Sequence, residues 1–517
     1  MVKAMGHRKH SDTGRGITFA HYRLDVQEGC LWKGTKRIPL STTDSAILAY
    51  LVSRAGRVVT RDELLAALWP DVAVTPGVVK VRVRRLRRAL GDRVNRPRFI
   101  ETAHGRGYRF IASVSAAPGE LEAGTGQAEM VRHLCRAARN AVRRRAPHEA
   151  ITVARKALPL VSSLTGAGER AAVEQELRVT IGRLELVRRE SDAPEVADNH
   201  VRLRALCDER PDDPSLLPAL VALARFELHR ADIRTAREIG ARVHRLAKQY
   251  RHRDLAGAHT LLGAADFNAG RLVSAEQHLA CALSLYDAAQ SQALGTAYGE
   301  NIEVPLQAYR ALVLWHRGFP RQALQASRAA LASARRLRLP APMAFALGMA
   351  AWLHRLRGEA DSAGGLATRL RDLATAEGFP FWRAQATFEL GWVAAARGHT
   401  DEGRALMQDG LQRYRATGAR LFDVGDRVGL LEVWPGAMAE HAATIEELIT
   451  SVTRNGQLYH ESSLHRLKAE SLLQRGDVDA AKASFEHAIA VAAAQGARPL
   501  EQRARAALNR PAEGQIG

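Results

Sequence analysis

The chain has 517 residues, of which 46% are hydrophobic and 25% charged, so it can hold about two to four domains of ordinary globular composition. Its formal net charge of +20 is concentrated at one end: residues 1–115 hold 22 Lys and Arg against 9 Asp and Glu, which leaves a net charge of +7 for the other 402 residues. This distribution excludes a uniformly basic protein and favours a nucleic-acid-binding module joined to a nearly neutral body.

The cysteines and the apolar runs exclude several further classes. The four cysteines lie far apart, at Cys30, Cys135, Cys207 and Cys281, without a C-x-x-C pair or a histidine cluster at ligand spacing. We therefore expect no disulfide framework, zinc site or cofactor. Residues 1–10 are charged but lack the apolar core of a signal peptide, and the longest apolar run, Met343 to Leu353, is too short to span a membrane. The expectation is a soluble, cytoplasmic protein without a membrane partner.

The first predicted elements form a small sheet followed by a helix. Residues 17–40 alternate in short pieces with turns near Gly29 and Gly34, which predicts antiparallel strands. Ser41 and Thr42 can cap a helix that ends near Gly56. Its inward-facing residues are predicted to be Ile47, Leu48, Leu51 and Val52.

Two more helices are predicted before residue 91. Thr60-Arg-Asp-Glu63 fits a capping box, in which the threonine hydroxyl and the glutamate carboxylate each satisfy a backbone N–H of the other residue. The helix that it starts carries Leu64, Leu65 and Leu68 and ends at Trp69-Pro70. The third helix begins after Thr75-Pro76, an N-cap with proline at the first helical position, and ends at Gly91.

The third helix has one apolar and one basic side. Its apolar stripe consists of Val79, Val83, Leu86 and Leu90. Six cations lie within nine residues, with no acid at i±4: Lys80, Arg82, Arg84, Arg85, Arg87 and Arg88. Such a run is often only a solvated surface, but at this density the cations repel one another unless an anion lies against them. Nucleic acid is the better interpretation.

A hairpin follows between Arg98 and Ile111, with Gly105 and Gly107 able to supply positive φ at its tip. A sheet, three helices and a terminal hairpin make a winged helix-turn-helix. The motifs Leu40-Ser-x-x-Asp44, Gly56-Arg-Val-Val-Thr-Arg-Asp-Glu-Leu-Leu65, Leu68-Trp69, Val83-x-x-Leu-Arg87 and Gly105-Arg-Gly-Tyr-Arg-Phe110 resemble the OmpR/PhoB-type DNA-binding domain. We expect this domain at residues 13–114.

The resemblance implies how double-stranded DNA is contacted. Arg85 and Arg87 match arginines that contact DNA in the family, and Arg84 matches a position on the phosphate side. Val81 matches an apolar contact to a thymine methyl group, although an incidental surface valine is the alternative. The remaining helix cations, Lys80, Arg82 and Arg88, are expected in the same interface in the major groove.

The wing and one loop give further expectations from the resemblance. Thr102 matches a phosphate contact, whereas the minor-groove arginine of the family falls at His104, so this sequence departs from the pattern there. Arg106 is the candidate to replace that arginine. The loop at residues 70–74 corresponds to the segment through which the family usually contacts RNA polymerase.

The rest of the chain predicts helical repeats. Residues 115–127 form a linker rich in Ala, Gly and Glu, and residues 128–510 show helical patterns without strand alternation. Glycines recur at spacings of 38 to 48 residues, at Gly270, Gly318, Gly358, Gly398, Gly436 and Gly476. Small residues stand at fixed distances on either side of them: Gly263, Ala311, Ala351, Gly391 and Ala469 before, and Ala275, Ala323, Ala363 and Ala481 after. This period predicts a tetratricopeptide-like α-solenoid with a concave surface.

The repeats also resemble the C-terminal parts of large bacterial winged-helix regulators, through Glu377-Gly-Phe-x-x-Trp382, Leu390-Gly-Trp392 and Leu464-His-Arg-Leu-Lys468. Those regulators usually carry a P-loop ATPase between the two parts, and this chain has no Gly-Lys dipeptide. No nucleophile elbow or His-Glu-x-x-His helix occurs either, so we expect no enzyme. Single histidines such as His354 and His465 are expected to be structural, and Trp315, Trp352, Trp382 and Trp392 are expected in the core.

The predicted fold is therefore mainly α, a small α+β winged domain followed by an α-solenoid. The favoured function is a sequence-specific transcriptional regulator, controlled through repeats that bind an unknown protein or associate with themselves. Fewer than 17 residues precede the first strand, too few for a phosphoacceptor domain. The alternative is a repeat scaffold whose winged helix binds DNA non-specifically or docks a partner.

Overall fold

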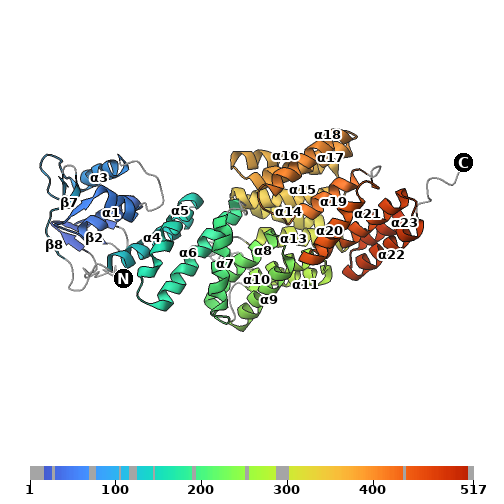
Figure 1. Ribbon diagram of the computed structural model, residues 1–517, viewed down its shortest axis with the longest axis horizontal. Coiled ribbons are helices and arrows are strands. Elements are labelled where there is room, and N and C mark those ends of the chain that lie inside the picture. The colour runs from blue at the N-terminus through green and yellow to red at the C-terminus, as the bar shows by residue number, and fades with distance from the viewer. Residues whose placement is uncertain are drawn as a thin grey trace, which may run out of the picture. The chain divides into compact units, whose positions relative to one another are not determined.

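The computed structural model describes all residues except 1–16, 26–29, 69–76, 104–105, 116–124, 144–145, 189–193, 251–254, 287–301, 435–437 and 510–517. The chain divides into two compact units, residues 1–181 and 182–517 (Figure 1). No helix among the described residues is both long and apolar enough to cross a lipid bilayer.

The first unit begins with strands that form two antiparallel sheets. The strands are β1 (Ile17–Phe19), β2 (Tyr22–Asp25), β3 (Cys30–Lys33), β4 (Lys36–Ile38), β5 (Val58–Thr60), β6 (Ile100–Ala103), β7 (Gly107–Phe110) and β8 (Val114–Ser115). One sheet has the order β4-β3-β2-β1-β8 and the other the order β5-β7-β6. The sheet predicted at residues 17–40 and the hairpin predicted at residues 98–111 are both present.

Three helices alternate with these strands: α1 (Thr42–Val52) follows β4, and α2 (Arg61–Leu68) and α3 (Gly77–Leu90) lie between β5 and β6. Ser41 caps α1, since its side-chain oxygen accepts a hydrogen bond from the Asp44 amide at 3.2 Å. A single core joins these helices to both sheets, and the predicted inward-facing residues of α1 and α3 are all in it. The fold of a winged helix-turn-helix is thus confirmed.

The wing is held against the domain by a close backbone approach. Gly107 has φ +151°, and a Cβ there would lie 2.0 Å from the carbonyl oxygen of Val59 on β5. Only glycine fits this position, because any side chain would push β7 away from β5.

The predicted capping box of α2 is only half formed. The Thr60 hydroxyl accepts a hydrogen bond from the Glu63 amide at 3.0 Å, as predicted. The Glu63 carboxylate does something else: it accepts hydrogen bonds from Arg57 and from the Tyr50 hydroxyl. A capping motif cannot reveal such competition, because Tyr50 lies on a different helix.

The first unit continues with α4 (Thr125–Arg143), α5 (Pro147–Ala157), η1 (Leu158–Ser163) and the first turns of α6 (Ala167–Arg188). These elements share a small core around Val131, Leu164 and Leu177. The division between the units falls within α6, beyond the linker predicted at residues 115–127.

The second unit is entirely helical within its described residues. Its elements are α7 (Pro194–Asp208), η2 (Pro214–Leu216), α8 (Leu217–His229), α9 (Ile233–Gln249), α10 (Leu255–Asn268), α11 (Leu272–Leu285), α13 (Glu303–His316), α14 (Pro320–Leu337), α15 (Pro340–Leu356), α16 (Ala360–Ala376), α17 (Pro380–Ala396), α18 (Thr400–Arg415), α19 (Asp423–Glu432), α20 (Ala442–Asn455), η4 (Leu458–His460), α21 (Glu461–Gln474), α22 (Val478–Gln495) and α23 (Arg498–Leu508). Consecutive helices pack as antiparallel pairs (Figure 1).

The predicted repeat pattern coincides with these pairs. Five of the six recurring glycines have positive φ in the turn between paired helices: Gly270, Gly318, Gly358, Gly398 and Gly476; Gly436 lies outside the described residues. Between α17 and α18, a Cβ on Gly391 would lie 2.7 Å from the Gly403 carbonyl oxygen. The small residues therefore let paired helices approach to backbone contact, which confirms the tetratricopeptide-like solenoid.

Aromatic side chains from distant repeats meet inside the second unit. Tyr459 of η4 lies 4.8 Å from the ring of Phe267 and 6.2 Å from that of Trp352, between ring centroids. Trp352 in turn lies 5.5 Å from Phe422. The Tyr459 side chain of η4 therefore packs against α10 and α15, helices of two other repeats.

Candidate nucleic-acid interface and a polar pocket in the repeats

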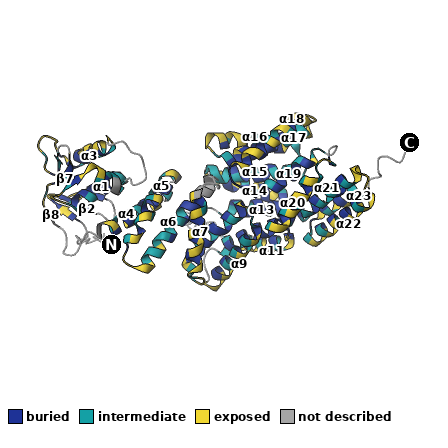
Figure 2. Cartoon of the chain, viewed as in Figure 1, coloured by how far each residue is buried: buried dark blue, intermediate teal, exposed yellow. Residues whose placement is uncertain are grey.

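The amphipathic pattern of α3 is realised in the structure. Val79, Val83, Leu86 and Leu90 are each at most 2% exposed. At about 100° per residue, the exposed residues of the helix occupy an arc of roughly 140° on the other side. Besides Gly77 at the first position, the exposed residues are Lys80, Val81, Arg84, Arg85 and Arg88, and we call these five residues the α3 face (Figure 2).

The cations of the α3 face have no counter-charge. Among the described residues, Lys80, Arg84, Arg85 and Arg88 form neither an ion pair nor a side-chain hydrogen bond. Val81 lies among them and is 55% exposed. An exposed valine among four cations is unfavourable in water. A DNA groove offers phosphates to such cations and thymine methyl groups to such a valine.

Arg82 points elsewhere, toward the start of α1. Its Nη1 atom lies 3.4 Å from a carboxylate oxygen of Asp44 and donates a hydrogen bond of 3.2 Å to the Ser41 hydroxyl. Asp44 is only 5% exposed. This contact fixes the rotation of α3 about its axis, so Arg82 positions the helix.

Arg87 is buried, in contrast to the arginines beside it. It is 7% exposed, and its guanidinium donates to the carbonyl oxygen of Ile100, at 2.8 Å from Nη2, and to the Thr102 hydroxyl at 2.7 Å. Arg87 therefore links α3 to β6 of the wing. The family resemblance predicted a DNA contact for Arg87, and its partners on β6 are not apparent from helical periodicity.

Asp92 joins the same two elements and was not singled out from the sequence. Its carboxylate accepts backbone N–H groups of Arg98 at 2.7 Å and Ile100 at 2.8 Å, as well as those of Arg93 and Phe99. Its own amide donates to the Arg87 carbonyl at 2.8 Å. One buried carboxylate thus ties the end of α3 to the beginning of the wing.

The residues of the wing that were predicted to contact DNA differ in their surroundings. Arg106 is exposed at the turn between β6 and β7, while the Thr102 hydroxyl is engaged by Arg87. His104 lies outside the described residues, and so does the loop at 70–74 that was predicted to contact RNA polymerase.

The second unit holds a pocket whose polar residues are deeply buried. It is lined by side chains of α15, α17, α19 and η4, among them Trp352, Arg355, Trp382, Gln385, Glu389, Asp426 and Tyr459. The Arg355 guanidinium lies 3.1 Å from the Glu389 carboxylate and 4.0 Å from that of Asp426, all three side chains being at most 8% exposed. Gln385 donates a hydrogen bond of 2.8 Å to Asp426.

Burial shifts the pKa values of both carboxyl groups in this pocket. Burial raises the pKa of Asp426 to about 8, although the nearby Arg355 guanidinium opposes the shift. Burial also raises the pKa of Glu389, again against the effect of Arg355. One buried arginine therefore faces two carboxyl groups, and Asp426 is mostly protonated at neutral pH.

The comparisons with known proteins agree with this structure. Residues 34–110 match the family described as "Transcriptional regulatory protein, C terminal". The response regulator protein GraR of Staphylococcus haemolyticus is 40% identical over 95 residues, which are 18% of this chain and 42% of the relative. GraR of Staphylococcus saprophyticus is 38% identical over 98 residues, or 19% of this chain and 43% of the relative. The chain therefore spans less than half of the curated relatives it matches.

Two solved structures match the two regions separately. The DNA-binding domain of Klebsiella pneumoniae RstA, in complex with the RstA box, is 30% identical, with a TM-score of 0.18, and the match covers 19% of this chain and 98% of that one. A Rap protein complexed with Competence and Sporulation Factor is 13% identical, with a TM-score of 0.51, over 71% of this chain and 99% of that one. This second likeness shows the fold of the helical region only. The N-terminal domain is an OmpR/PhoB-type winged helix-turn-helix of the transcriptional-regulatory-protein C-terminal family.

Proposed function

We propose that the protein is a sequence-specific DNA-binding transcriptional regulator whose α3 lies in the major groove. The observation that carries this proposal is the α3 face, in which four unpaired cations surround an exposed Val81. A domain retained only for docking would have no need of an apolar residue at this place.

The geometry supports separate roles for the residues predicted to bind DNA. Arg85 and Arg88 lie near Val81 on the helix, so we assign them to base edges, where an arginine can make two hydrogen bonds to guanine. Lys80 and Arg84 lie toward one side and are assigned to phosphates. Arg82 and Arg87 hold α3 in place, and Arg87 also positions Thr102. Arg106 and His104 remain the candidates for a minor-groove contact from the wing.

Binding of the full-length chain to DNA tests this proposal. A labelled duplex from the upstream region of its own gene is titrated with the protein at about 150 mM salt, and a shuffled duplex of the same composition serves as control. We expect affinities that differ by roughly 1000-fold or more, the lower range for specific recognition. Equal affinities would contradict sequence specificity and favour the scaffold with non-specific DNA binding.

We also propose that the second unit controls the DNA-binding domain by binding a protein or peptide ligand. Two observations support this: the shared fold with a Rap protein that is complexed with Competence and Sporulation Factor, and the buried charged pocket. Burying ionisable groups costs stability, and buried groups with shifted pKa values are often found at functional sites. Because the side chains of Arg355 and Tyr459 are buried, we expect the ligand to contact the partly exposed Trp352 and to act on the Arg355–Glu389 ion pair behind it.

The full chain purified from its native host, with whatever copurifies, tests this second proposal. We expect the copurifying ligand to change the affinity for the specific duplex, and Arg355→Gln to abolish that response. The exposed Arg397→Gln serves as matched control. An unchanged response in Arg355→Gln would place the ligand elsewhere on the repeats.

A further inference from the structure

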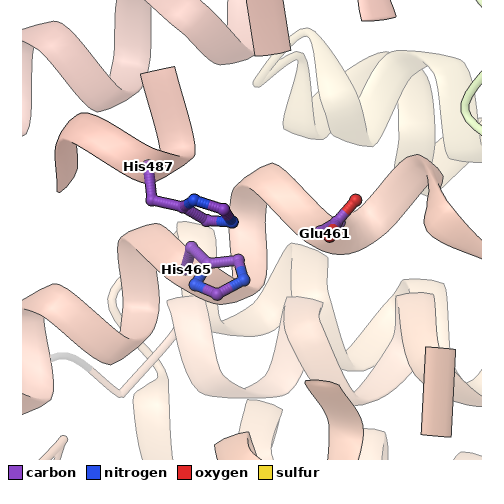
Figure 3. Close-up of side chains that lie close together, drawn as sticks. All are labelled: Glu461, His465 and His487. Atoms are coloured by element: carbon purple, nitrogen blue, oxygen red, sulfur yellow. The ribbon is translucent and has the colours of Figure 1, made fainter. Parts of the chain in front are cut away.

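Three metal-binding side chains come together on the last repeats of the second unit. Glu461 and His465 stand one helical turn apart on α21, and His487 stands on the neighbouring α22 (Figure 3). One ligand atom from each of the three lies within 4.8 Å of the other two. The rings of His465 and His487 have centroids 4.2 Å apart.

The helix pair holds these side chains in register. The Ser462 hydroxyl donates to the Ala488 carbonyl at 2.9 Å, and the Ser484 hydroxyl donates to the His465 carbonyl at 3.0 Å. Both serines are buried, at 1% and 8% exposure, and each bond crosses from one helix to the other beside a member of the cluster. The positions of the three donors are therefore set by the packing of α21 on α22.

We propose that Glu461, His465 and His487 bind a divalent transition-metal ion, with Zn²⁺ as the expected occupant. Two imidazoles and one carboxylate are a donor set that suits zinc. Mg²⁺ and Ca²⁺ are disfavoured, because they prefer oxygen ligands throughout. Zinc at about 2.0–2.1 Å from each donor needs donors roughly 3.4 Å apart in a tetrahedron, so small side-chain rotations close the site.

The surroundings allow an ion to enter and to bind. His487 is exposed, and Glu461 also lines a surface groove beside Gly270 and Gln495. Three protein donors leave the fourth position of zinc to water or to a side chain of a partner.

The bound ion would connect α21 to α22 and stiffen the last repeat. Metal binding at this site does not depend on DNA binding, so a test of one does not decide the other.

Zinc binding to the full chain, purified without a histidine tag and stripped with a chelator, tests the proposal. The probe is Zn²⁺ alone, in competition with a chromophoric chelator at pH 7.5. We expect one ion per chain that is lost in His487→Gln, with affinity lowered roughly 100-fold or more, since changes outside the ligand shell alone cost 10–100-fold. His487 is exposed, so this change should leave folding intact, which circular dichroism checks.

Two matched controls separate this site from other histidines. His399→Gln removes an exposed histidine of the same unit, and His278→Gln removes one member of a cluster with His244 and His259. Both should bind zinc as the unaltered chain does. If His278→Gln loses the ion and His487→Gln keeps it, or if zinc binds only weakly and at several sites, the assignment is wrong.

Cobalt gives a second measurement. Co²⁺ bound by the unaltered chain should show visible absorption of a four- or five-coordinate site, and His465→Gln should abolish that absorption. An unchanged spectrum in His465→Gln would also overturn the proposal.

Discussion

The arginine side chains of the α3 face and those of the repeats differ in whether they are paired with acidic groups. On the α3 face, Arg84, Arg85 and Arg88 are exposed and pair with no acid in the part of the chain that the structure describes. In the repeats, arginines are paired across helices, as in Arg237–Asp266, Arg317–Glu276, Arg355–Glu389 and Arg466–Glu432. The same side chain therefore serves as a free cation in one region and as a structural link in the other.

The difference shows why net charge alone is a poor guide to nucleic-acid binding. A basic residue has fewer donors left for an interface when internal partners have taken some of them. Arg82 and Arg87 demonstrate this within α3 itself, since both are engaged by the domain. The following four changes test the comparison, from the largest expected effect to the smallest.

Arg355→Ala should be the most damaging change. It leaves the buried carboxyl groups of Glu389 and Asp426 without their counter-charge, which should lower the free energy of unfolding by about 3–5 kcal/mol. Urea denaturation followed by circular dichroism measures the loss. In the control Arg397→Ala, the lost ion pair with Asp361 is exposed and the cost should stay below about 1 kcal/mol. Equal losses would show that the repeat arginines are not structural links.

Asp426→Asn should change how stability depends on pH. The pKa of Asp426 is raised by burial to about 8 in the folded chain, against an ordinary value of 3.8, so its contribution is full below about pH 4 and is lost as pH rises toward 8. Between pH 5 and pH 7 the variant should gain roughly 2–3 kcal/mol relative to the unaltered chain. Urea titrations at both pH values measure this gain, and Asp361→Asn, 94% exposed, should show none.

Arg85→Ala should relax sequence discrimination. Losing a two-bond contact to a base should cost about 1–3 kcal/mol on the specific duplex and much less on a shuffled one. Fluorescence anisotropy with both duplexes measures the difference. Lys36→Ala, an exposed cation on β4, should leave the ratio of the two affinities unchanged. An equal loss of affinity for both duplexes would show that Arg85 contacts phosphates and not bases.

Lys80→Ala should have the smallest effect. A phosphate contact weakens binding to all duplexes alike, and its removal should reduce the slope of log affinity against log salt by about 1. Anisotropy at four salt concentrations gives the slope. An unaltered slope would mean that Lys80 lies off the DNA.

Much of the fold could be predicted because its determinants are local. The stripe of Val79, Val83, Leu86 and Leu90 and the spacing of the repeat glycines depend on periods of 3.6 and about 40 residues, which the sequence displays directly. The residue types and the periodicity also identified the α3 face, although the assignment of DNA contacts remains a prediction.

What could not be predicted depends on contacts between elements. The burial of Arg87 requires knowledge that Ile100 and Thr102 lie beside it, and the half-formed capping box requires Tyr50. The same holds for His465, expected to be structural: its partner His487 is 22 residues away. Both histidines lie 11 residues from Gly476, so a search for donors placed symmetrically about each repeat glycine would have found the pair.

Asp92 has a consequence for the DNA rather than for the protein. Its carboxylate accepts hydrogen bonds from three backbone amides at the start of the wing, those of Arg98, Phe99 and Ile100, and therefore ties the wing to the end of α3. If α3 and the wing both contact DNA, as proposed, the distance between the two contacts is fixed and the protein cannot adjust it to its site. The duplex has to bend or narrow instead, so base steps that no side chain touches would be selected for their flexibility.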